Sequence, residues 1–211
     1  MKKLFFIGMC CAICSQQSFA SQIFNKIHPF ITAEMGATVN AQNNGVMEKY
    51  GVPYSTLSSD GMNFTYGGNF GIRFLDDSHI YHPGIQMFYN HVTGDAKLDV
   101  ASAYGSTKFN IDTSHNLFGA EFDNYIRIDE QDGQQVFIVL GLDAGTIRST
   151  YTPEFINTDI KDTGNFYGAK IEYLAEDARG FGLSISMKFL KTDTEALSHI
   201  LLNRIGLRYT F

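Results

Sequence analysis

The chain is poor in cysteine and proline and has no tryptophan. Its 211 residues include three cysteines and four prolines. All three cysteines, Cys10, Cys11 and Cys14, lie within the first 20 residues. Removal of that segment leaves a chain without thiols, which excludes a disulfide framework, a cysteine nucleophile and a cysteine metal site.

No apolar run after residue 20 is long enough for a membrane-spanning helix. The N-terminal segment MKKLFFIGMCCAICSQQSFA has two lysines, an uncharged run from Leu4 to Cys14, and small residues near its end. This pattern predicts a cleaved secretory signal peptide at residues 1–20, followed by one domain at residues 21–211. A lipidated cysteine is the alternative, but Met9 and Ile13 stand where a small residue would precede it.

The predicted mature chain is acidic. Without the two signal lysines, the 16 basic residues become 14, against 22 acidic residues, so the net charge is −8. We therefore expect no nucleic-acid partner. We also expect no cofactor and no metal, because no third ligand accompanies His79 and His82, and no helix follows the glycines of residues 67–71.

The chain is rich in strict alternation of apolar and polar residues. In the segment NFTYGGNFGIRF, large apolar side chains from Phe64 to Phe74 share one face of a strand. A strand of this length is long for a soluble sheet, but suits a tilted strand that crosses a bilayer. Seven further segments alternate in the same way, near residues 31–39, 84–91, 118–128, 136–145, 167–173, 181–189 and 201–211.

Long and short connections alternate between these eight predicted strands. The long ones span residues 40–61, 93–114, 147–163 and 190–198, and the short ones span residues 75–80, 129–134 and 174–180. This is typical of an outer-membrane barrel with short periplasmic turns and long external loops. The sequence therefore predicts an all-β, eight-stranded antiparallel up-and-down transmembrane β-barrel. A soluble lipocalin-like barrel, with its apolar side chains inside, is the alternative.

Single charges of both signs lie on the polar faces of most predicted strands. A narrow barrel has little internal space, and buried charges need partners, so we expect these residues to form ion pairs across the lumen. The lumen ion-pair candidates are Glu34, Arg73, Glu121, Asp123, Arg127, Asp143, Lys170, Glu172, Lys188, Arg204 and Arg208. Their pairing depends on strand register, which the sequence does not give.

The chain ends in RIGLRYTF, on the aromatic residue of an alternating strand. Arg204, Gly206, Tyr209 and Phe211 match the β-signal of small bacterial outer-membrane β-barrels of the opacity-protein and OmpA-barrel type, and the whole mature sequence resembles this family. The resemblance implies the outer membrane of a Gram-negative bacterium, with outer-membrane lipid and the barrel-assembly machinery as partners. No peptidoglycan-binding domain follows Phe211, so anchoring to the cell wall is not implied.

Such a scaffold hosts several functions, and three hypotheses stay open. The first is a structural or surface-exposed protein, adhesin-like or antigen-like, that meets an extracellular protein through its loops. Residues 95–112 alternate through Leu98, Val100, Phe109 and Ile111, which predicts either an extended hairpin whose edge accepts a partner strand or a mobile loop.

The second hypothesis is a small-conductance, porin-like pore, and the third is an enzyme that modifies lipid in the outer leaflet. A lumen filled with side chains should conduct little. No His-x-Ser pattern like that of the lipid A deacylases is present. We therefore expect no enzyme and no catalytic residues.

Overall fold

The computed structural model describes residues 26–42, 55–59, 62–76, 79–102, 105–131, 133–154 and 158–211. The predicted signal peptide lies outside these residues. The strands of the described residues are β1 (Ile27–Gln42), β2 (Ser55–Ser59), β3 (Asn63–Phe74), β4 (Tyr81–Ser102), β5 (Gly105–Gln131), β6 (Gln134–Pro153), β7 (Ile160–Glu176), β8 (Phe181–Thr192) and β9 (Leu197–Thr210). Across these ranges, no helix has the length and hydropathy needed to cross a membrane.

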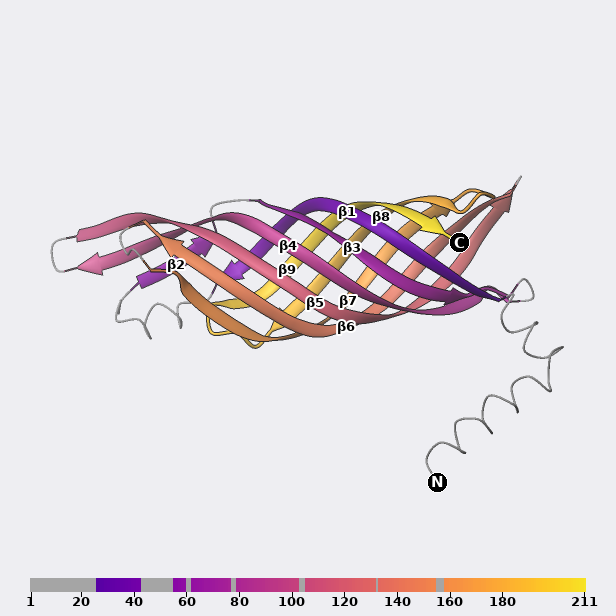
Figure 1. The fold of residues 1–211 in the computed structure, drawn as a ribbon. Coiled ribbons are helices and arrows are strands. Elements are labelled where there is room, and N and C mark those ends of the chain that lie inside the picture. Colours follow the sequence, from indigo (N-terminus) through magenta and orange to yellow (C-terminus); the bar gives the residue numbers. More distant parts are fainter. Residues whose placement is uncertain are drawn as a thin grey trace, which may run out of the picture.

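Eight of the strands pair into a closed antiparallel ring (Figure 1). The order is β4-β3-β1-β9-β8-β7-β6-β5, and β5 pairs again with β4. The last strand is held by the first, with Phe30 opposite Thr210, and the Phe211 N–H donates to the Pro29 carbonyl over 2.8 Å. The predicted eight-stranded up-and-down barrel is therefore confirmed.

Strand β2 was not predicted, because it lies inside the connection at residues 40–61. It pairs with the far part of β4, where Leu57 stands opposite Leu98. Strand β3 pairs with β4 only as far as Thr93, so β4 would otherwise present an unpaired edge beyond that point. An exposed edge is a ready template for another strand, and this chain supplies one itself.

Strands β4 and β5 continue as a hairpin well beyond the rest of the ring (Figure 1). Their pairing runs to Ser102 opposite Gly105, so the extended hairpin is confirmed over the mobile loop. We call β2 and residues 91–102, 105–116, 146–153 and 160–165 the outer extension. It has its own buried apolar cluster, which consists of Leu57, Ala96, Leu98, Ile111, Tyr151, Ile160 and Ala196.

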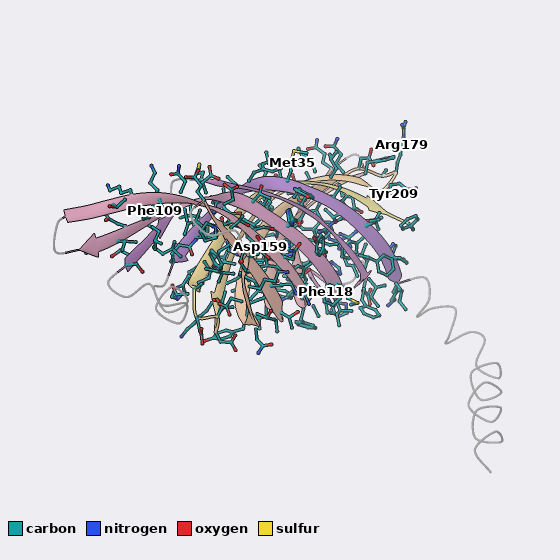
Figure 2. The ribbon with its side chains drawn as sticks, turned by 60° about the vertical axis from the view of Figure 1, so that its left-hand side comes forward. Met35, Phe109, Phe118, Asp159, Arg179 and Tyr209 are labelled. Carbon is teal, nitrogen blue, oxygen red and sulfur yellow. The ribbon has the colours of Figure 1, made fainter. Side chains whose placement is uncertain are left out.

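The large apolar side chains of the ring point outward. The exposed fraction is 61% for Phe70, 46% for Leu140, 59% for Ile185 and 68% for Leu207. Side chains project from the whole outer surface of the sheet, among them Met35 of β1 (Figure 2). We call this surface the apolar belt. On β5 it ends at Phe118, because the outward residues between Phe118 and the tip of the hairpin are polar. The apolar face of each strand is therefore outside, and the polar face is inside.

Candidate functional site

The lumen holds a network of buried charges at its centre. Lys170 contacts Glu121 and lies 3.1 Å from Asp123 and 2.7 Å from Glu172. Lys188 lies 2.5 Å from Glu121, which therefore bridges both lysines. Because all these side chains are almost fully enclosed, each charge depends on its partners rather than on water.

Asp143 completes this central network. Its carboxylate lies 2.6 Å from Lys188 Nζ. The neutral Gln86 amide donates to Glu121 and, over 2.7 Å, to Asp123, so it bridges two carboxylates without adding charge. Gly141 leaves room for the network, because a Cβ at that position would lie 2.5 Å from Asp123 Oδ1.

Two arginines of β9 extend the network toward opposite rims. Arg208 donates to Glu172 over 2.9 Å, and Arg204 pairs with Glu34 and donates to Asn90 over 3.0 Å. The Arg208 guanidinium carbon also lies 4.4 Å from the centre of the Phe30 ring, which favours a cation there.

Arg73 has a partner that the sequence analysis missed. Its guanidinium donates to Glu176 over 2.8 Å and lies 4.9 Å from the centre of the Phe137 ring. Glu176 was assigned to a short turn, whereas β7 continues through it. The alternation of Lys170, Glu172, Leu174 and Glu176 was a sequence signal that would have identified it.

Arg127 corrects the prediction, because it does not lie in the lumen network. The pairing of β5 with β6 shifts register between Arg127 and Asp129, which is typical of a β-bulge. Arg127 instead donates to Glu130 over 2.9 Å at the end of the barrel, where the Glu130 side chain is half exposed. The Arg127 side chain shares the inward face of Phe137, which stands opposite it, but it lies at the rim and its partner is half exposed. The other ten candidates also face inward and are buried.

Apolar side chains fill the lumen on both sides of the central network. Toward the outer extension lies a cluster of Phe88, Val92, Leu117, Ile147, Phe166, Leu190, Leu197, Ile200 and Leu202. Toward the opposite rim lies a cluster of Phe30, Tyr125, Phe137, Val139 and Leu174. The described part of the lumen is thus a packed core built around charges.

The outer extension buries a histidine beside a serine. His115 Nδ1 lies 2.9 Å from Ser149 Oγ, and both side chains are fully buried. Burial, together with the smaller effect of the neighbouring His91, lowers the pKa of His115 to about 4. The pair resembles a nucleophile and base, but it lies where no substrate reaches it, so it supports packing rather than catalysis.

The described residues contain no group of three or more histidine, cysteine, aspartate or glutamate side chains arranged to hold a metal ion.

The residues of the predicted β-signal divide between the two faces of β9 and its end. Arg204 and Gly206 face inward, and Tyr209 and Phe211 face outward, with their ring centres 4.9 Å apart. Recognition by an assembly machinery stays a prediction.

The chain was compared with known proteins. No family model and no curated protein sequence matches it. Among solved structures, Neisserial surface protein A is similar, with 12% identity and a TM-score of 0.46 over 87% of this chain and 97% of that one. Ail, the attachment invasion locus protein of Yersinia pestis, has 15% identity and a TM-score of 0.37 over 85% and 98%. The fold assignment rests on the strand pairing of this chain itself.

Proposed function

We propose that this chain is an integral outer-membrane β-barrel that displays its outer extension at the cell surface. The observation that carries the proposal is the inverted distribution of side chains. Apolar side chains cover the outside of the ring, whereas lysines, arginines and carboxylates pair inside it. Water as the outer solvent would penalise this arrangement, but hydrocarbon favours it.

The height of the apolar belt fits a bilayer. On β9 it runs from Leu201 to Phe211, where the outward side chains at alternate positions are apolar or aromatic except for that of Asn203. Ten residues rise about 33 Å along a strand, and a tilt of about 45° reduces this to about 23 Å across the membrane. Outer-membrane barrels have an apolar band of about 25 Å.

Rings at the rim opposite the outer extension support the same interpretation. Phe181 and Tyr209 have ring centres 4.8 Å apart, and Phe211 is 67% exposed. Aromatic side chains gather at membrane interfaces, where apolar rings meet water. This rim would then face the periplasm, and the outer extension would face the outside.

The outer extension supports a structural or adhesive role at the surface over a role as a pore. Parts of five strands and their shared apolar cluster give it a folded shape beyond the membrane. Its outward face is polar, with Asp95 beside Asp112 and Asp99 beside Lys108. A rigid polar sheet of this kind can present a constant surface to an extracellular protein.

The location in the outer membrane is tested first by fractionation and by gel mobility. Outer-membrane fractions from cells that express the full chain are run on a denaturing gel, with and without boiling. We expect one band whose mobility changes on heating, because a closed barrel resists detergent. Recovery of the protein in the soluble periplasmic extract would contradict the proposal.

The surface role is tested separately by shortening the hairpin. Cells displaying the protein are measured for adherence to surfaces coated with basement-membrane extract, with and without deletion of residues 101–107. A matched variant carries Glu130→Gln at the opposite rim. We expect adherence to fall with the deletion alone, and equal adherence of all three strains would remove the adhesive role while leaving the membrane location intact.

A further inference from the structure

One wall of the lumen carries polar side chains without partners. Thr38 and Asn40 of β1 and Asn63 and Thr65 of β3 form this polar wall, and each is at least nine-tenths buried. Within the described part of the chain, both threonine hydroxyls, the Asn63 amide nitrogen and both Asn40 amide atoms have no hydrogen-bond partner. Because buried polar groups are nearly always hydrogen-bonded, this concentration in one place needs an explanation.

The four side chains lie next to one another. Thr38 stands opposite Asn63 in the register of β1 and β3, and Gly36, two residues along β1, stands opposite Thr65. Gly36 also stands opposite Arg204 of β9, whose Nε and Nη2 are buried without partners. The polar wall is therefore a continuous surface that leads to the Glu34 and Arg204 ion pair.

The flanks of the polar wall are apolar. Thr65 stands opposite Val92 of β4, and Thr38 stands opposite Leu202 of β9. Val92 and Leu202 both belong to the buried apolar cluster that fills the rest of the lumen at this level. Unpartnered polar atoms also occur elsewhere in the described residues, for example on Ser184 and Tyr151, but the polar wall gathers five of them on two paired strands.

We propose that water enters the lumen along the polar wall and reaches Arg204. The unpartnered atoms include both donors and acceptors, and apart from Arg204 they are neutral, so water suits them better than an ion does. Successive inward residues of β1 lie about 6.6 Å apart, a gap that one water molecule with two hydrogen bonds of about 2.8 Å nearly spans.

Gln42 marks the entrance of this water path. It follows Asn40 on the same face of β1, it is partly exposed, and both its amide atoms lack partners among the described residues. The path ends below Arg204, where Lys188 is paired with both Glu121 and Asp143. The Glu34 and Arg204 pair is therefore the lumen ion pair that solvent reaches from the outer extension side, which the proposed function places outside the cell.

The test compares side-chain amide protons in the folded protein. Magnetisation transfer from water is measured by NMR for Asn63 and for Gln86, which is equally buried but donates to two carboxylates. We expect the Asn63 amide protons to receive it about tenfold faster or more, because water is their direct partner. Equally slow transfer to the amide protons of both residues would show that no water lies along the polar wall. Equally fast transfer to both would show water throughout the lumen. Either result would overturn the proposal.

A second measurement uses near-isosteric variants. In a dry wall, Thr65→Val removes a buried hydroxyl that has no partner, so the urea midpoint should rise. In a hydrated wall the same change removes a hydrogen bond to water, so the midpoint should fall. The mobility shift on heating checks that the variant folds, which separates a failure of this inference from a failure of the proposed barrel.

Discussion

Replacement of Lys188 by methionine tests whether the lumen charges act as partners. Lys188 lies on β8, is fully buried, and contacts Glu121 and Asp143 over 2.5 Å and 2.6 Å. Methionine has a similar length but no charge, so Asp143 would keep its negative charge without its cation. Removal of one partner from a buried ion pair costs about 3–5 kcal/mol, because the other charge remains enclosed.

The assay is equilibrium unfolding in urea with the protein in lipid vesicles. The chain has no tryptophan but 11 tyrosines, so tyrosine fluorescence and gel mobility report unfolding. With a slope of about 3 kcal/mol/M, the expected cost lowers the urea midpoint by about 1–1.7 M. The double variant Lys188→Met with Asp143→Asn should recover at least about half of the loss, because the unpaired charge is gone.

Lys191 supplies the matched control on the same strand. It lies three residues further along β8, on the outer face, and makes no ion pair within the described residues. Lys191→Met should change stability by less than about 0.5 kcal/mol. If Lys188→Met and Lys191→Met had equal effects, the interpretation of the lumen as a mutually dependent charge network would be refuted.

Three further predictions concern the rim, the outer extension and conduction. Arg127→Ala should cost less than about 1 kcal/mol in urea unfolding, because its partner is half exposed, whereas Arg73→Ala should cost about 3–5 kcal/mol; the reverse order would contradict the assigned positions. His115 has a pKa of about 4 in the folded protein, below its ordinary value of 6.5, so the unfolded chain takes up this proton at a higher pH than the folded chain. The free energy of unfolding should therefore fall by up to about 3 kcal/mol as the pH drops from 6.5 to 4. His115→Gln should remove this pH dependence, and parallel pH profiles for both proteins would disprove it. Planar-bilayer recordings should show little or no conductance, because apolar clusters fill the lumen on both sides of the charges; large stable currents would refute the packed lumen.

The strands and their faces were predictable because alternation with period two depends only on local sequence. Phe70, Leu140, Ile185 and Leu207 lie on the outer face as their patterns indicated. Alternation alone does not say which face meets which solvent. In this chain, the paired charges and glycines on the opposite face decided the question, since a narrow interior accommodates them.

The partners inside the lumen were not predictable, because they join residues far apart in sequence. Lys188 and Glu121 are separated by 67 positions, and only the register of four neighbouring strands, β5 to β8, brings them together. Arg127 differs for a related reason, since it lies at the rim just before the register shift and meets Glu130 of its own strand end instead of a distant strand. Strand β2 was missed because its five residues are too few for a periodic signal.

The most direct test of the account measures which side of a single strand meets hydrocarbon. Spin labels are placed one at a time along β8, from Phe181 to Thr192, in residues 21–211, which contain no cysteine, in lipid vesicles. Collision rates with oxygen, which concentrates in hydrocarbon, are compared with those of a water-soluble nickel complex. We predict oxygen maxima at every second residue, at Leu183, Ile185, Met187 and Phe189. Maxima at Ser184, Ser186 and Lys188, or preference for the nickel complex at the apolar positions, would contradict the account.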